Sequence, residues 1–339
     1  MRHAAIAEPC AVGFGLVCLV LVALIGAGPA HAQVAVPADV RAGIPDAYAT
    51  FAGKFDAYEV VLAPPEDAAE WWAGAPSVVR DAAGTFWLAA RMRTAEAPRG
   101  LRGYELQLLR SEDGIDFELV KRIRREEVPI AGFERPALLQ HPETGAFMLY
   151  ACGPWGPERE WSIIKFDDAQ TPADFDASTA RAVIAPRAKT YARDIRPDGY
   201  KDPVILFAEG AYHAYVIGTM RRTERIYHFT SSDGEVWAPV GNYYESIMDL
   251  EGWHDFYVRP ASVLPTEIGY FFFYEGSSVD WHDPVYNMGT GVGFTFDLHT
   301  IQELTTEGPL AISSTPSDHF HVFRYSHWIR VDGELWVYA

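Results

Sequence analysis

Residues Gly199–Val216 read GYKDPVILFAEGAYHAYV, and this stretch decides the fold. A proline begins an apolar strand, a Glu-Gly pair supplies a turn, and a second strand rich in Tyr and Val follows. Proline is tolerated at the first position of a strand because its missing N–H need not interrupt the hydrogen-bond ladder. Glycine supplies the backbone freedom that a tight hairpin needs. The stretch therefore predicts a β-hairpin.

The same unit occurs five times along the chain. Each copy has a strand, a short turn built on glycine and a second apolar strand, and the copies are centred on Pro76, Pro136, Pro203, Pro260 and Trp328. These positions lie 57 to 68 residues apart. A hairpin unit that recurs at such a pitch indicates a β-propeller in which each unit is one blade. We therefore expect an all-β fold, a five-bladed β-propeller.

The last repeat unit lacks strands that the segment before the first unit can supply. The last unit stops at Ala339, just after its second strand, so the fifth blade lacks outer strands of its own. A further strand pattern, Phe55–Leu62, precedes the first unit. We expect this N-terminal strand to join the fifth blade and close the ring. A truncated reading frame is the alternative explanation of the short fifth unit.

Residues 1–32 have the pattern of a secretory signal peptide. Arg2 precedes a long apolar run, which ends in Ala30-His31-Ala32 with small residues at the first and third positions before the cut. We expect cleavage after Ala32, export to the periplasm or the extracellular space, and no membrane association afterwards. Residues 33–339 then form a single propeller domain. A retained membrane anchor is the alternative.

The mature chain is strongly acidic. The whole sequence has a formal net charge of -18, and residues 1–32 contain one basic and one acidic residue, so cleavage leaves that charge unchanged. Such a chain is a poor partner for nucleic acid and for anionic membrane surfaces. Cys152 is the only cysteine after residue 32, so an exported protein has no internal disulfide and depends on its hydrophobic core.

Two turns share a further phrase, Ser-x-Asp-Gly followed by an aromatic residue. They are Ser111–Gly114 and Ser231–Gly234, and the phrase resembles the Asp-box turn of sialidases and related propellers. An Asp side chain in such a turn accepts hydrogen bonds from turn amides, while Gly adopts a positive φ. We therefore expect Asp113 and Asp233 to be structural and exclude them from the catalytic candidates.

The two faces of the predicted propeller differ. The turns inside each hairpin are short and lie on one face. The openings of the blades and the loops between second and third strands lie on the other face, and these segments are longer and rich in charged and aromatic residues. Loops on a rigid scaffold commonly carry function. We therefore place the functional site on this second face, around the central funnel.

The strand openings that end in Pro, Asp202-Pro203 in the third blade and the closing unit Ser326–Tyr338 resemble five-bladed propeller glycoside hydrolases. The nearest are family 43 and its relatives, families 32, 62, 117 and, more distantly, 130. The resemblance implies a funnel lined by three carboxylates: a base, an acid and an Asp that tunes the pKa of the acid. Asp202 falls at the position of the tuning Asp and His327 at that of an axial His. The resemblance implies no required cofactor, although a structural calcium ion can occupy the axis.

Two positions depart from the family 43 pattern. Gly74-Ala75-Pro76 stands where the family has the Asp that acts as base, and Val258-Arg259-Pro260 stands where it has the Glu that acts as acid. Other carboxylates on the same face can take these roles, so the catalytic candidates are Asp202, Glu134 and Glu275. The alternative for each of them is a structural ion pair with a neighbouring Arg or Lys.

The substrate-binding candidates lie on the same face. Arg135 and Arg259 each precede the proline of their blade, and Arg binds carboxylate or phosphate with two parallel hydrogen bonds. They would orient an acidic or hydroxyl-rich sugar; the alternative is that they brace Glu134 and Asp255. The other candidates, among them aromatic rings that can stack on sugars, are Trp155, Trp253, Asp255, Trp281 and His327. The Trp-His-Asp phrases at 253–255 and 281–283 have no spacing diagnostic of a metal site, so we assign no metal ligand.

The sequence therefore predicts an exported glycoside hydrolase that cleaves a poly- or oligosaccharide with carboxylates in the central funnel. Two alternatives stay open: a glycan-binding propeller without catalysis, and a glycoside phosphorylase similar to family 130, which would bind phosphate at the two arginines. A carbohydrate is the expected partner in each case. The oligomeric state is not determined by the sequence.

Overall fold

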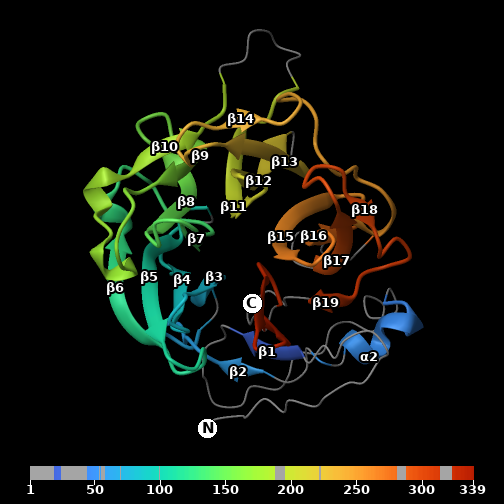
Figure 1. The fold of residues 1–339 in the computed structure, drawn as a ribbon. Helices are drawn as coiled ribbons and strands as arrows, with labels where there is room; N and C mark the ends of the chain where they lie inside the picture. Colours follow the sequence, from blue (N-terminus) through green and yellow to red (C-terminus); the bar gives the residue numbers. More distant parts are fainter. Residues whose placement is uncertain are drawn as a thin grey trace.

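The computed structural model describes residues 19–23, 44–52, 54, 58–68, 70–98, 100–187, 195–220, 223–280, 288–313 and 323–339. Its strands form five blades around a central axis, with the first strand of each hairpin nearest that axis (Figure 1). The prediction of an all-β, five-bladed β-propeller is confirmed. The blades follow the five sequence units in order.

The first three blades are four-stranded antiparallel sheets. The first blade comprises β3 (Trp72–Arg80), β4 (Phe86–Arg93), β5 (Gly103–Ser111) and β6 (Glu118–Arg124). The second comprises β7 (Ala137–Gln140), β8 (Phe147–Trp155), β9 (Glu160–Lys165) and β10 (Arg181–Ile184). The third comprises β11 (Gly199–Ala208), β12 (Ala211–Met220), β13 (Thr223–Ser231) and β14 (Ala238–Pro239).

The fourth blade is joined to the third by a parallel bridge between Glu224 and Tyr257. It comprises β15 (Tyr257–Pro265), β16 (Tyr270–Ser277), β17 (Met288–Thr295) and β18 (Gln302–Glu303), and β19 (Ala311–Ser313) also pairs with β17. The described helices are short: α2 (Ala49–Ala52) and the 3-10 turns Asp46–Tyr48, Arg125–Glu127, Pro172–Asp174, Ala177–Thr179 and Gly252–His254. Within the described ranges, none of the helices has the length and apolar character needed to span a membrane.

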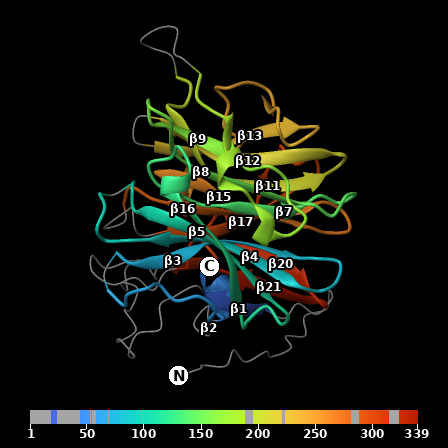
Figure 2. The ribbon, with the colours of Figure 1, turned by 90° about the vertical axis from the view of Figure 1, so that its left-hand side faces the viewer.

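The fifth blade contains strands from both ends of the chain (Figures 1 and 2). β20 (His327–Val331) and β21 (Glu334–Tyr338) form its hairpin. β1 (Leu19–Ala23) lies parallel to β21, and β2 (Glu59–Val60) lies parallel to β1. The N-terminal strand thus joins this blade as expected, but it is shorter than predicted and is separated from β21 by β1, which belongs to the predicted signal peptide. Pro64 and Pro65 follow β2, and prolines cannot donate to a strand ladder.

The inner strands of three blades contain β-bulges at their prolines. The register shifts between Gly74 and Ser77 in β3, between Lys201 and Val204 in β11, and between Pro260 and Ser262 in β15. We expected these prolines at the first position of each strand. They lie inside the strands instead, because a bulge removes the need for the N–H that proline lacks.

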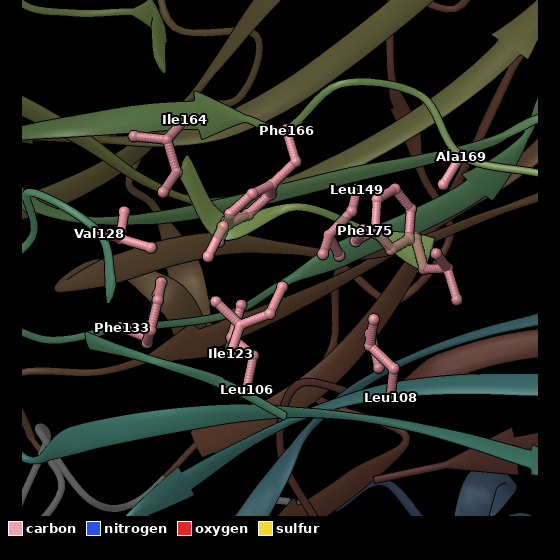
Figure 3. Packing of buried hydrophobic residues seen from close by; sticks show 14 of the residues in the cluster. Leu106, Leu108, Ile123, Val128, Phe133, Leu149, Ile164, Phe166, Ala169 and Phe175 are labelled. Atoms are coloured by element: carbon pink, nitrogen blue, oxygen red, sulfur yellow. The ribbon is translucent and has the colours of Figure 1, made fainter. Parts of the chain in front are cut away.

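The hydrophobic core lies mainly between neighbouring blades. Figure 3 shows the cluster between the first and second blades, where side chains from both sheets interdigitate. Leu106, Leu108 and Ile123 come from the first blade and Leu149 and Ile164 from the second, and all five are fully buried. This packing fixes the angle between blades and so the geometry of the funnel.

The structural role predicted for the two Asp-box turns is confirmed. Asp113 accepts hydrogen bonds from the backbone N–H groups of Ile115 and Asp116, each at 2.9 Å. Asp233 accepts the equivalent pair in the third blade. A third turn of this kind, which the sequence analysis missed, is centred on Asp297 and has Leu298 at a φ of 62° where the others have Gly.

Candidate active site

The candidate active site lies around the axis, where the inner strands begin. Charged side chains from all five blades meet or lie near one another there, and most are buried; they are Arg91, Glu134, Arg135, Lys201, Asp202, Glu224, Arg259, Glu275 and Arg324. Burial of so many charges requires that each be paired or that its pKa shift. The partners of each carboxylate therefore decide what it can do.

Asp202 is held by backbone and thiol groups of the second blade. It has a φ of 51°, in the left-handed region that non-glycine residues rarely adopt, and is only 1% exposed. Its Oδ1 accepts the N–H of Arg135 at 3.3 Å and the Cys152 thiol at 3.6 Å. Burial, and then the charge of Asp202, raise the pKa of Cys152 well above its usual value, so this thiol is a donor. Oδ2 of Asp202 has no hydrogen-bond partner among the described residues.

Glu275 is a buried carboxyl whose charged form is only partly stabilised by its neighbours. It lies opposite Arg259 in the β15–β16 ladder and accepts the backbone N–H of Tyr325 on Oε1. Burial raises its pKa above the usual value, although Arg259, Arg135 and Arg324 act in the opposite direction. The group therefore favours the protonated form more than an ordinary glutamate does.

Glu224 is a carboxylate that the sequence analysis missed. It accepts from the Lys201 ammonium at 2.5 Å and from Nε of Arg259. Burial alone would raise the pKa of Glu224, but Arg259 and Lys201 outweigh burial and lower the pKa to about 2. Glu224 is thus ionised, and it links the third blade to the fourth.

Glu134 pairs with Arg91 of the first blade, not with its neighbour Arg135. The side chain of Glu134 is 15% exposed, compared with 1% for the whole of Glu275, so it is the most accessible of the three catalytic candidates. Its backbone N–H donates to the carbonyl of Cys152 at 2.8 Å. The ion pair with Arg91 places a positive charge directly beside this carboxyl.

The two arginines predicted to bind substrate form hydrogen bonds with other groups of the protein. Arg135 donates to the carbonyl oxygens of Pro260 at 3.0 Å and Ala261 at 2.6 Å, which belong to the bulge of β15. Arg259 donates to Glu224. Among the described residues neither arginine forms an ion pair with the alternative partner named above: Glu134 pairs with Arg91, and Arg259 pairs with Glu224. The Oδ1 of Asp255 accepts the N–H of Val279 at 2.9 Å.

His327 lies at the axis, on β20. Burial, and then the nearby Arg135, lower its pKa to about 3, so the imidazole is neutral. A neutral ring beside a guanidinium does not suit calcium, which prefers several anionic oxygens. Among the described residues no group of three or more His, Cys, Asp or Glu side chains is placed to hold a metal ion. His254 instead bonds Glu303 at 2.6 Å.

The predicted tryptophans pack within the blades where they are described. Trp253 lies flat on Tyr274, with ring centroids 5.6 Å apart, and its Nε1 donates to the carbonyl of Thr305 at 2.7 Å. Trp155 is half-buried against the core between the first and second blades. Trp281, together with the second Trp-His-Asp phrase, lies outside the described residues.

The structure adds Arg91 and Tyr325 to the site. The ring of Tyr325 has the guanidinium of Arg91 at 5.4 Å and that of Arg135 at 6.0 Å from its centroid. A repeat-based signal for Arg91 was present in the sequence. Arg91, Cys152 and Glu275 are each the sixth residue of the second strand of their blade, so aligned units place all three beside the axis.

Comparisons with known proteins support the fold. No protein-family model and no curated protein matches the sequence. Among solved structures, one described as a complex of BT0996 and RGII has a TM-score of 0.57 at 12% identity, with 80% of this protein and 83% of that one covered. One described as "Glycoside hydrolase" also has a TM-score of 0.57, at 13% identity and the same coverage. A glycosyl hydrolase from Bacteroides ovatus has a TM-score of 0.50 at 14% identity over 71% of each protein. The protein therefore has a propeller fold that solved glycoside hydrolases share.

Proposed function

We propose that the protein hydrolyses glycosidic bonds of an oligo- or polysaccharide at this site. Glycoside hydrolysis requires one carboxyl group that donates a proton to the leaving oxygen and one that is ionised. The observation that carries the proposal is the environment of Glu275, whose raised pKa contrasts with the lowered pKa of Glu224 near the same axis. The fold shared with solved glycoside hydrolases supports it.

Each carboxyl has a role in this proposal. Glu275 donates the proton, because burial favours its protonated form. Glu134, which pairs with Arg91 and is more exposed, acts as base or nucleophile. Asp202 tunes Glu275 through Arg135, whose electrostatic environment includes both carboxyls. Because Glu275 is 1% exposed, a neighbour such as Tyr325 must move aside before the substrate reaches it.

The test measures turnover of a panel of aryl glycosides and oligosaccharides, with and without phosphate. The variants are Glu275→Gln and Asp202→Asn, and Glu143→Gln in the exposed turn on the opposite face is the matched control. We expect phosphate-independent turnover that falls at least about 100-fold in Glu275→Gln, as for loss of a general acid, and also falls in Asp202→Asn. The control should be unaffected.

Two other outcomes would reject hydrolysis. Absence of turnover on every substrate, with glycan binding unchanged in both variants, would identify a glycan-binding propeller; the extensive pairing and burial of the carboxylates favours this candidate. Turnover that requires phosphate would identify a phosphorylase, although Arg135 and Arg259 already have partners within the protein.

We also propose that the protein is exported and cut after Ala32. The apolar run and the small residues before the cut support this. Cleavage would remove β1 and leave the edge of β21 to the segment that contains β2. Intact mass measurement of the protein recovered from the periplasm or the medium should give a chain that begins at Gln33. A full-length mass in those fractions would contradict the proposal.

A further inference from the structure

Arg93 is a cation without a matching carboxylate. Three arginines, Arg91, Arg93 and Arg102, are grouped on the first blade, but only two carboxylates pair with them. Glu134 pairs with Arg91, and Glu70 pairs with Arg102. In the part of the chain that the structure describes, no carboxylate lies within ion-pair distance of Arg93. The group therefore has one positive charge in excess.

The excess charge lies at a partly buried position. Arg91 and Arg93 are two residues apart in β4, so their side chains leave the same face of the sheet. Burial, and then repulsion from Arg91, lower the pKa of Arg93 to about 9. The guanidinium of Arg93 lies 5.6 Å from the ring centroid of Trp72, and its Nε has no hydrogen-bond partner among the described residues. An external anion would relieve this repulsion.

Open space lies beside these two arginines. Across the β3–β4 ladder Trp72 pairs with Arg93, and Gly74 pairs with Arg91. A Cβ atom added at Gly74 would meet no described heavy atom within 4 Å. Gly74 does not have a positive φ, so its backbone does not require glycine. What glycine provides here is room between the Trp72 ring and the axis.

We propose that Trp72, Gly74, Arg91 and Arg93 form a subsite for an anionic sugar, with the negative group on Arg93 and the sugar ring beside Glu134. A guanidinium binds a carboxylate through two parallel hydrogen bonds, and an aromatic ring offers an apolar surface to the sugar. A uronic acid carboxylate fits this chemistry, and sulfate or phosphate esters share it. Assigning the anion to a glycan rests on the proposed function, whereas anion binding itself requires no catalysis.

The test is a calorimetric titration of the whole protein and of the Glu275→Gln variant, in which slow turnover should not disturb the binding measurement. The probes are glucuronate and galacturonate, their neutral counterparts glucose and galactose, and the 6-sulfate and 6-phosphate of glucose. We expect at least one anionic sugar to bind about 10-fold or more tighter than its neutral counterpart, and this preference should weaken with added salt. Comparison of uronates with esters identifies the source of the charge.

Two variants separate recognition from folding. Arg93→Gln should abolish the preference for anionic sugars, and Gly74→Leu should prevent binding of every sugar by filling the open space. Both should keep the melting temperature of the parent, since Arg93 has no ion pair to lose and Gly74 has free space beside it. Arg330→Gln, an exposed position on β20, is the control and should retain the preference.

The outcomes distinguish this inference from the proposed hydrolysis. Equal affinity for neutral and anionic sugars, or a preference retained in Arg93→Gln, would overturn the anionic subsite. Turnover of anionic glycosides that is unchanged in Arg93→Gln would also overturn it while leaving hydrolysis intact. Arg93-dependent binding of anionic sugars without any turnover would support the subsite and reject hydrolysis.

Discussion

The guanidinium of Arg259 lies near two carboxyl groups whose pKa values are shifted in opposite directions. Arg259 lies opposite Glu275 in the ladder and donates directly to Glu224. Glu224 has Lys201 as a second cation, whereas Glu275 has only the backbone N–H of Tyr325 as its hydrogen-bond donor among the described residues. The pKa of Glu224 is therefore lowered and that of Glu275 is raised. The difference in partners thus shifts the pKa values of these two carboxyl groups in opposite directions.

The pH dependence of activity should follow Glu275. As a proton donor it must be protonated, and burial keeps its pKa above the usual 4.5. We expect kcat/KM to fall as the pH rises through this raised pKa. Residual turnover in Glu275→Gln should lack this basic limb. Rates measured between pH 4 and pH 9 would check this, and an identical basic limb in the variant would assign the limb to another group.

Glu224 should determine part of the stability in acid. Its pKa is lowered from 4.5 to about 2, so its stabilising contribution is complete above pH 4.5 and is lost as the pH falls towards 2. We expect Glu224→Gln to lower the free energy of unfolding at pH 7 by about 3–5 kcal/mol, because Lys201 and Arg259 are left buried without their partner. Urea unfolding at several pH values measures both effects. Glu143→Gln is the control, and an unchanged acid slope in Glu224→Gln would contradict this assignment.

The Asp-box turns connect the blades through buried tyrosines. The hydroxyl of Tyr338 in the fifth blade donates to the carbonyl of Gly114 in the first at 3.0 Å. Tyr150 in the second blade donates to Gly234 in the third at 2.8 Å, and Tyr215 in the third donates to Leu298 in the fourth. Each turn is thus an element of the interface between blades, and its conformation matters beyond its own loop.

Two glycines with similar backbones should respond differently to substitution. Gly114 has a φ of 76° and Gly333 a φ of 88°, so alanine costs about 1–2 kcal/mol at either position through strain alone. At Gly114 the new Cβ would also lie 2.8 Å from the Tyr338 hydroxyl, whereas at Gly333 no described atom lies within 4 Å. We expect Gly114→Ala to cost a further 1–3 kcal/mol, roughly, for overpacking. Equal losses in urea unfolding would show that the contact with the fifth blade does not matter.

The sequence determined the blades but not the pairing at the axis. Hairpins were predictable because proline, glycine and apolar residues act locally within each unit. The bulges were not, since the proline pattern also fits a strand that begins at proline. The charged pairs were missed for another reason: Glu134 pairs with Arg91 of the preceding blade rather than with the adjacent Arg135. Such partners depend on the register between blades, which composition and spacing do not encode.

Trp328 packs at the interface between the fifth and fourth blades. It is 2% exposed and stacks on Phe273 of the fourth blade, with centroids 4.0 Å apart and planes 6° apart. It also lies parallel to Phe51 of α2, within 4° and with ring centroids 6.3 Å apart. The backbone N–H of Trp328 donates to the hydroxyl of Ser262 in the fourth blade at 3.1 Å. One residue thus joins the C-terminal hairpin, the fourth blade and the N-terminal segment.

Loss of this side chain should destabilise the whole propeller and not the fifth blade alone. Trp328→Ala should lower the free energy of unfolding by about 3–5 kcal/mol, the usual cost of removing a buried Trp. Because Arg324, Tyr325 and His327 precede it in the chain and belong to the axial site, we expect activity and fold to be lost together on heating. Val236→Ala, at a side chain that is 76% exposed, is the control. Thermal unfolding followed by both activity and near-ultraviolet circular dichroism tests this, since activity lost well below a cooperative transition would mean that the fifth blade opens independently of the ring.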